Sequence, residues 1–404
     1  MNVDTMRRID RQAGVPLCAI ATVMVWVWER LWRRPARPTR RVLFVELSEM
    51  GTTVLAQPAM RKAREKLGAD LFFVIFRRNV GSIELLGDFP AENICTIRDT
   101  SILHLAIDTL KFLMWTRAKD IDTVVDLELF SRFTALLTGF AGADRRVGFH
   151  RFHQEGLYRG EMLTHRVSYN PHIHISKNLV ALVDALTVAP QVPYSKTIIG
   201  DEDMTAKIAP ASEEMRATML ACIRTEIAFE PARQRLVLVN PNASEMLPHR
   251  RWMADRYADV IRRLLASHPD IVVAVTGAPS ERVEAEALAK ASGERCISLA
   301  GKTTLAELPA LYAHAALMLS NDSGPAHFSA AAGCRTVVLF GPEIPRLYQP
   351  LGPSRAIYAG LACSPCVSAH NHRKTACTDN VCMQVITVDQ VYGVVCEELA
   401  KPAR

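Results

Sequence analysis

The segment SNDSGPAHFSAAAG, residues 320–333, brings chemically active side chains to the start of a predicted helix. Asp322 follows an apolar run, and Ser323 and Gly324 form the tight turn after it. His327 lies in the first turn of the helix. The first N–H groups of a helix lack an intrahelical acceptor and favour anions such as phosphate. The alternative interpretation is an Asp or Ser that only caps the helix, worth about 1 kcal/mol.

A second candidate site is the turn in FVELSEMGTTVLAQPAM, residues 44–60. An apolar strand ends there and a helix begins, which is typical of a ligand-binding loop. The turn carries the carboxylates Glu46 and Glu49, and Thr52 comes directly after Gly51. A positioned carboxylate can act as a general base.

Four cysteines form a third cluster with the pattern C-x2-C-x10-C-x4-C: Cys363, Cys366, Cys377 and Cys382. This spacing is compatible with tetrahedral zinc or with an iron–sulfur cluster. Free or regulatory thiols are an equal alternative. Disulfides are a third one, although they are unusual in a reducing cytoplasm.

These candidate residues need an α/β scaffold, and the sequence predicts one. Nearly continuous apolar strands alternate with helices in two series, which indicates parallel, doubly wound sheets. We expect one such domain over residues 41–198, a second over 199–385, and a closing helix over 386–404. Ligands bind beyond the carboxyl ends of the strands in such sheets, which is where all the motifs lie.

Residues 1–40 are basic and apolar, and they carry much of the chain's net charge of +6. Nine arginines lie before residue 42: Arg7, Arg8, Arg11, Arg30, Arg33, Arg34, Arg37, Arg40 and Arg41. Nothing downstream resembles a nucleic-acid module, so an anionic membrane surface is the better partner. The apolar run from Val15 to Trp28 is short for a bilayer span, and its tryptophans lie beside arginines. We expect a helix on the membrane surface; a helix packed on the protein and a true span are the alternatives.

Further motifs occur in order along the chain: NPNASEMLPHRRW (240–252), TGAPSE (276–281), GKTTLAELPALYAHA (301–315), DSGPAH (322–327) and LFGPEIPRLYQP (339–350). The N-terminal half contributes MGTTVLAQPAM and VVDLELFSRFTALLTGFAGADRRVGFH. Together they resemble glycosyltransferase family 9, the heptosyltransferase-like enzymes of lipopolysaccharide assembly, from about residue 41 to 390.

The resemblance implies a GT-B fold with two Rossmann-like domains and an inverting, metal-independent transfer. The donor in that family is usually ADP-heptose, and the acceptor is a lipid-linked saccharide. It therefore implies an enzyme at the cytoplasmic side of the inner membrane, with the donor bound by the C-terminal domain and the acceptor by the N-terminal domain.

A nucleotide-sugar donor leaves as a diphosphate, so its site must stabilise developing negative charge. The resemblance assigns donor contacts to Asn242, Ser244, Arg250, Arg251, Gly277, Glu281, Asp322, Ser323, Gly324 and His327. The family often has lysine in place of Arg250 and glycine in place of Asn242. Glu281 matches a carboxylate that contacts the nucleoside ribose in the family.

The catalytic base is where the match departs from the family. Family members usually carry an aspartate directly after the glycine, where this chain has Thr52, and threonine has no useful basicity near neutral pH. Either Glu49 has taken the role, with Glu46 a weaker candidate, or the protein no longer catalyses. On the acceptor side we expect contacts from Gly51, Thr52, Arg132 and His150.

Two other functions fit the same fold. One is a non-catalytic protein that binds a nucleotide sugar and has lost the base. The other is an epimerase or hydrolase of nucleotide sugars, which would consume the donor without any acceptor.

Overall fold

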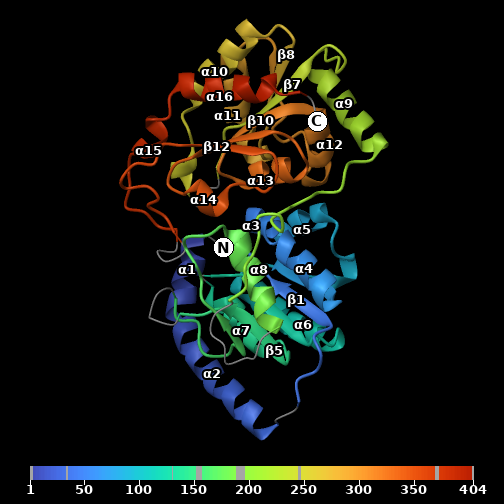
Figure 1. The fold of residues 1–404 in the computed structure, drawn as a ribbon, viewed down its shortest axis with the longest axis vertical. Coiled ribbons are helices and arrows are strands. Elements are labelled where there is room, and N and C mark those ends of the chain that lie inside the picture. Colours follow the sequence, from blue (N-terminus) through green and yellow to red (C-terminus); the bar gives the residue numbers. More distant parts are fainter. Residues whose placement is uncertain are drawn as a thin grey trace. The chain divides into compact units, whose positions relative to one another are not determined.

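The structure is a computed structural model that describes residues 3–32, 35–129, 131–151, 157–187, 196–243, 247–368 and 373–402. The chain divides into two compact units (Figure 1): unit 1, Met1–Met204, and unit 2, Thr205–Ser368 with Arg373–Arg404. The division falls a few residues after the predicted boundary at 198. The N-terminal helices belong to unit 1, and the C-terminal helix belongs to unit 2.

Unit 1 is built on a six-stranded parallel sheet with the strand order β3-β2-β1-β4-β5-β6. Its strands are β1 Arg41–Val45, β2 Asp70–Phe76, β3 Ile94–Ile97, β4 Thr123–Asp126, β5 Arg145–Phe149 and β6 His165–Val167. Its helices after β1 are α3 Met50–Leu55, α4 Gln57–Leu67, α5 Val80–Leu86, α6 Ile102–Ala118, α7 Arg132–Phe140 and α8 Ile175–Asp184, with 3₁₀ turns at Arg77–Asn79, Ala91–Asn93 and Ala185–Thr187.

Unit 2 repeats this plan with the strand order β12-β11-β10-β7-β8-β9, again all parallel. Its strands are β7 Arg235–Asn240, β8 Ile271–Val275, β9 Cys296–Ser298, β10 Ala315–Asn321, β11 Thr336–Phe340 and β12 Ser354–Tyr358. Its helices are α9 Glu213–Glu226, α10 Ala254–Ser267, α11 Arg282–Ser292, α12 Leu308–His314, α13 Gly324–Ala331, α14 Pro345–Tyr348, α15 Val381–Gln384 and α16 Val388–Ala400, with 3₁₀ turns at Pro248–Arg250, Pro279–Glu281 and Leu305–Glu307.

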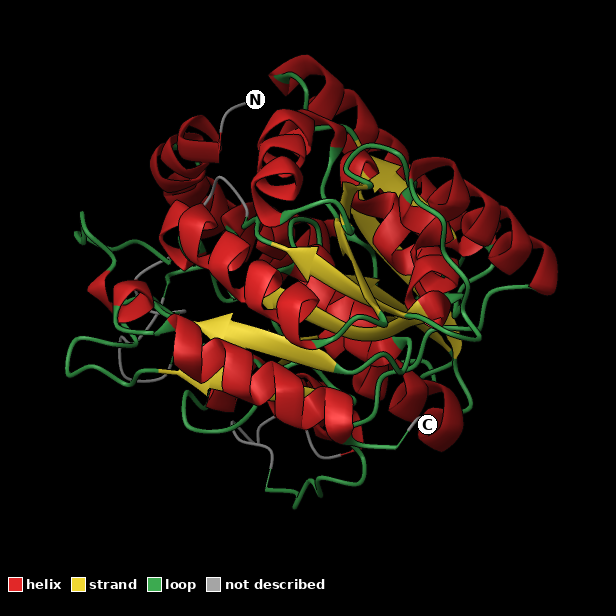
Figure 2. Cartoon of the chain, turned by 90° about the horizontal axis from the view of Figure 1, so that it is seen from above, coloured by secondary structure: helices red, strands yellow, loops and turns green. Residues whose placement is uncertain are grey.

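The predicted fold class is confirmed, because the two sheets are wholly parallel and helices lie on either side of the strands (Figure 2). Their strands read as continuous apolar runs because both faces are covered. Local signals also hold, since Gly68 ends α4 in the left-handed conformation with φ of 60°.

The strand order reverses between β1 and β4 in unit 1 and between β7 and β10 in unit 2. Ligands of open α/β sheets bind beyond the carboxyl ends of the strands at such switch points. The loops after β1, β7 and β10 carry Glu49, Arg250 and Asp322 respectively. The topology therefore places the candidate residues where a ligand is expected in each unit.

The basic N-terminal segment forms two helices, α1 Val3–Gln12 and α2 Gly14–Leu31. α2 packs on α7 through a face of small side chains: Gly14, Cys18 and Ala21. The opposite face is exposed and apolar, with Leu17, Ile20, Val23, Met24, Trp26, Trp28 and Leu31. By length and composition α2 could cross a membrane, and one of its faces is covered by unit 1.

Candidate functional site

The loop after β10 in unit 2 gathers the side chains predicted from the sequence. Asp322 is buried, and its N–H donates to the carbonyl of Leu339 at 3.0 Å. Ser323 is the N-cap of α13, which begins at Gly324, and His327 is buried in the first turn. The helix N-terminus therefore lies beside a carboxylate and an imidazole, an arrangement suited to a phosphorylated ligand.

Arg250 joins this loop to the loop after β7. Its Nε lies 3.4 Å from Oδ2 of Asp322, and its Nη1 donates to the Asp322 carbonyl at 3.3 Å. Its Nη2 donates to Oε1 of Glu343 at 2.8 Å. The side chain of Arg250 is 15% exposed, whereas Glu343 is almost fully enclosed at 1%. A guanidinium thus stands at the edge of the site, held by two carboxylates.

Three further residues predicted to contact the donor lie close together in unit 2: Asn242, Gly277 and Glu281. Oε2 of Glu281 accepts from Nδ2 of Asn242 at 2.9 Å and from the N–H of Ala278 at 2.7 Å. A Cβ on Gly277 would lie 2.9 Å from Asn242 Nδ2 and 3.0 Å from Glu281 Oε2. Gly277 therefore lies close to both side chains, and the carboxylate is held by its neighbours.

Two further donor predictions have a different outcome. The Nη2 of Arg251 donates to the carbonyl of Ala243 at 3.2 Å. Ser244 lies outside the described residues.

In unit 1 the loop after β1 places Glu49 beside Thr52. Oγ1 of Thr52 donates to Oε2 of Glu49 at 2.8 Å, and the N–H of Thr53 bonds to the Glu49 carbonyl at 3.3 Å. Glu49 is the N-cap of α3, and Gly51 lies in that helix. The Glu49 carboxylate is half-buried and lies next to the position that follows the glycine.

Glu46 has a different environment, because it is buried at the end of β1. Its Oε1 accepts from the N–H groups of Ser48 at 3.2 Å and Glu49 at 3.1 Å. Glu128 faces it from the loop after β4 and accepts from Ser48 Oγ at 2.9 Å. Burial, then the Glu128 and Glu49 charges, hold the pKa of Glu46 well above its usual range. Glu46 therefore favours its protonated form and fixes the loop that carries Glu49.

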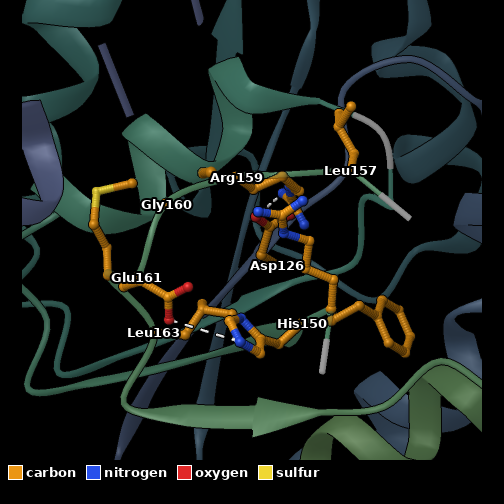
Figure 3. A pocket seen from close by; sticks show the side chains of 11 residues that line it. Asp126, His150, Leu157, Arg159, Gly160, Glu161 and Leu163 are labelled. Atoms are coloured by element: carbon orange, nitrogen blue, oxygen red, sulfur yellow. Dashed lines mark hydrogen bonds and ion pairs between the residues drawn. The ribbon is translucent and has the colours of Figure 1, made fainter. Parts of the chain in front are cut away.

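A pocket in unit 1 lies at the carboxyl ends of β4 and β5 (Figure 3). It is lined by Asp126, Ala135, Phe149, His150, Arg151, Leu157, Arg159, Gly160, Glu161, Met162 and Leu163. His150 is within it, with Nε2 at 3.6 Å from Oε2 of Glu161. Arg159 pairs with Asp126 and donates to the Glu128 carbonyl at 2.6 Å. Arg159 thus lines the pocket and also bonds to Asp126 and Glu128 at the carboxyl end of β4.

Arg132 does not line this pocket, and its side chain is enclosed. Its Nε donates to the carbonyl of Tyr158 at 2.9 Å, and its Nη1 lies 3.2 Å from Oδ2 of Asp10. These contacts attach α1 to α7. An acceptor contact for Arg132 stays a prediction.

The cysteine cluster forms no disulfide. All ten cysteines of the chain fall within the described residues, and the structure records no disulfide among them, which contradicts the disulfide alternative. Burial, followed by the charges of Cys366, Cys377 and Cys363, raises the pKa of Cys382 to about 11. The other three thiols therefore lie within electrostatic range of Cys382. Across the described part of the chain, however, no group of three or more His, Cys, Asp or Glu side chains is arranged to hold a metal ion.

A family model described as glycosyltransferase family 9 (heptosyltransferase) matches residues 113–376, well over half of the chain. The chain belongs to glycosyltransferase family 9. It is 31% identical over 118 residues to lipooligosaccharide heptosyltransferase 2 of Haemophilus influenzae, a match that covers 28% of this chain and 34% of the relative. In this match and two similar ones, the chain covers only 34% to 43% of the length of the curated relative.

Solved structures of family 9 show the same fold. E. coli ADP-heptose lipopolysaccharide heptosyltransferase II superposes with a TM-score of 0.68 at 19% identity, covering 89% of this chain and 98% of that one. An iron-containing, dodecameric heptosyltransferase, TibC, superposes with a TM-score of 0.52 at 11% identity, covering 90% of this chain and 77% of that one. These likenesses confirm the two-domain GT-B architecture.

The structure adds three residues to these candidate sites that the sequence analysis did not name. Glu343 lies beyond β11 within the motif LFGPEIPRLYQP, and Glu128 lies beyond β4 within VVDLELF, so both had a usable signal in their position after a strand. The sequence signal for Asn321 was weaker. It is fully buried, and its Oδ1 accepts from the Trp252 N–H at 3.2 Å and the Tyr257 hydroxyl at 2.9 Å.

Proposed function

We propose that this family 9 protein is an inverting glycosyltransferase. It moves a heptose-like sugar from an ADP-linked nucleotide-sugar donor to a lipid-linked saccharide in cell-envelope glycan synthesis. The observation that carries the proposal is the donor-type cluster of unit 2, in which Arg250 is held between Asp322 and Glu343 at the N-terminus of α13. The names of family relatives support the sugar class.

The reaction divides between the residues as follows. An acceptor hydroxyl attacks the anomeric carbon while the bond from that carbon to the diphosphate oxygen breaks. Glu49 takes the hydroxyl proton, and the nucleoside diphosphate leaves with the bonding electron pair. Arg250 and the N-terminus of α13 stabilise the charge that develops on the diphosphate. Asn242, Gly277 and Glu281 hold the nucleoside, and Gly51, Thr52 and His150 line the acceptor side.

Glu49 is the residue on which catalysis is most directly tested. Glu49→Gln should abolish transfer, by at least about a hundredfold, while ADP binding measured by calorimetry is retained. Thr52→Asp in the Glu49→Gln background places a carboxylate where other family members have aspartate, and should restore part of the activity. Full activity of Glu49→Gln would remove Glu49 as the base.

The non-catalytic alternative is favoured by a single observation, the threonine at position 52. It predicts that ADP or an ADP-sugar raises the melting temperature by mass action while no transfer occurs with any acceptor. An epimerase or hydrolase would instead consume the donor without an acceptor. Absence of any nucleotide-dependent shift would contradict all three functions.

We also propose that unit 1 binds the anionic surface of the inner membrane from the cytoplasmic side. Trp26 and Trp28 are each 62% exposed on α2, and Trp28 stacks on Trp32 at 4.5 Å between ring centroids. Arg8, Arg11 and Arg30 are exposed on the same two helices, which complements anionic lipid. Arg37 does not add to this charge, because it pairs with Asp120 and Asp144.

Co-sedimentation with vesicles tests this membrane proposal. The wild-type protein should bind vesicles that contain phosphatidylglycerol and bind neutral phosphatidylcholine vesicles weakly. Trp26→Glu with Trp28→Glu should reduce binding by about tenfold or more. Val283→Glu, at a residue 78% exposed on α11 of unit 2, is the matched control and should bind normally. Equal binding by all variants would contradict a role for α2.

A structural metal at the four cysteines is the last part of the proposal. Its support is the proximity of the thiols to Cys382 and the iron-containing relative TibC. The side chains would have to rotate toward a common centre to bind it. Elemental analysis of the purified protein tests this point. The double variant Cys363→Ser/Cys382→Ser should lose the metal.

A further inference from the structure

We infer that the cysteine-rich loop, residues 363–368 and 373–382, holds the donor arginine in place, with Arg373 and Asn380 as its positioning residues. The inference rests on the proposed role of Arg250 at the donor diphosphate. It assigns the loop a function in unit 2 that does not depend on whether the thiols bind a metal.

The first part of the loop is bonded to the segment that leads to Glu343. The N–H groups of Cys366 and Val367 both donate to the Pro342 carbonyl, at 3.1 and 3.3 Å. A Cβ on Gly341 would lie 2.3 Å from Sδ of Met383 and 3.1 Å from Sγ of Cys382. The end of the loop and the following Met383 therefore pack closely on Gly341, and the bonds to Pro342 attach the loop to the residue next to Glu343.

The last part of the loop is bonded to the backbone on both sides of Arg250. Nδ2 of Asn380 donates to the carbonyl of His249 at 3.2 Å and to the carbonyl of Arg251 at 3.3 Å. Asn380 has a φ of 38°, in the left-handed region that asparagine tolerates. One amide thus spans the turn whose central residue is Arg250.

Arg373 acts on the same arginine through a shared carboxylate. Its Nε lies 3.5 Å from Oε1 of Glu343, the oxygen that also accepts from Nη2 of Arg250. Its guanidinium lies over the ring of Tyr348, 5.2 Å from the centroid, and its side chain is 13% exposed. Glu343, at 1% exposed, is therefore a buried carboxylate between two arginines.

The charges of the side chains around Arg250 explain why Arg373 matters for its position. Arg250 and Arg373 carry two positive charges, and Asp322 and Glu343 carry two negative ones, so the four side chains are balanced before a donor binds. Without Arg373 the carboxylates would exceed the remaining guanidinium by one charge, and Arg250 would be drawn fully to them. Arg373 neutralises part of Glu343 and leaves Arg250 able to face a diphosphate.

Calorimetric titration of the full-length protein with ADP tests this inference. Arg373→Ala and Asn380→Gly should each weaken ADP binding by about tenfold and raise KM for the sugar donor, with kcat largely kept. Glycine tolerates the backbone at 380, so this variant removes only the amide. Arg373→Lys keeps the charge and should recover part of the affinity. Arg346→Ala, an exposed arginine of α14 in the same motif, is the matched control and should bind as wild type.

A double-mutant cycle separates positioning from direct binding. If Arg373 acts through Arg250, the Arg250→Ala/Arg373→Ala protein binds ADP no more weakly than Arg250→Ala alone. Additive losses would make Arg373 a phosphate ligand in its own right and overturn the inference. So would unchanged ADP affinity in both Arg373→Ala and Asn380→Gly while Arg250→Ala is impaired, and in that case the proposed function would stand. A wild-type protein that binds no ADP would overturn the proposed function and this inference together.

Discussion

Glu46 and Glu49 lie three positions apart, and their surroundings give them different properties. Glu46 is buried, and its carboxyl group accepts the N–H of Glu49 itself. Glu49 is half-buried and bonds to the Thr52 hydroxyl. When the environments of two carboxyl groups differ in this way, one can stay protonated while the other is ionised. In this loop the buried group serves as the support and the outer one as the proposed base.

This division predicts how stability depends on pH. The folded state raises the pKa of Glu46 well above its ordinary value of 4.5, so it retains a proton that the unfolded chain releases. The free energy of unfolding should therefore fall as pH rises from about 4.5 through the raised pKa. Glu46→Gln mimics the protonated group and keeps an acceptor for Ser48 and Glu49. It should remove part of this decline and raise the melting temperature at pH 8 by about 2–4 °C.

Melting curves between pH 5 and 8 measure this effect. Glu84→Gln, an exposed carboxylate on α5, should melt with the wild-type pH profile. An equal loss of stability in Glu46→Gln at every pH would mean that the ionised carboxylate is needed, and the assignment of Glu46 would be wrong.

At the scale of elements, the apolar strands and the residues that follow them could be predicted from the sequence. Asp322 comes directly after β10 and Glu49 lies in the loop after β1, so the sequence could mark both as candidates at positions where the topology makes ligand sites. Arg373 could not be found in this way, since it lies in a loop and reaches Glu343 only through tertiary contacts. Arg132 was predicted as a site residue, but its contact could not be predicted. Its position at the start of α7 gives no sign that it will pair with Asp10 of α1.

The face by which α2 packs gives a prediction about this element. Cys18 and Ala21 are buried there, and a Cβ on Gly14 would lie 2.8 Å from Cβ of Arg132. Gly14→Val should therefore cost about 1–3 kcal/mol by overpacking the contact with α7. It should lower the melting temperature and expose α1 and α2 to limited proteolysis.

The control lies on the opposite side of the same helix. Ile20 is 56% exposed, so Ile20→Ala should leave both the melting temperature and the proteolysis pattern unchanged. The reverse result, with Ile20→Ala destabilising and Gly14→Val silent, would show that α2 packs by its other face.

At the scale of the whole molecule, the two units have separate hydrophobic cores. The core of unit 2 joins Val237, Tyr257, Val273, Leu319, Val337 and Val395, all within its own residues. The core of unit 1 contains Leu43, Val74, Phe112, Val124 and Leu137. Each unit also completes its own six-stranded sheet. A unit with its own core and sheet has what an independently folding domain requires.

Residues 205–404 alone should therefore fold and bind ADP. Every contact named for the donor group, from Arg250 to Arg373, lies within this segment. The fragment should melt cooperatively and bind ADP within about threefold of the full chain, because ligand affinity depends on the groups that contact the ligand. Arg250→Ala in the fragment is the matched control and should lose binding as it does in the full chain. A folded fragment that fails to bind ADP, when the full chain does bind it, would show that unit 1 contributes to the nucleotide site.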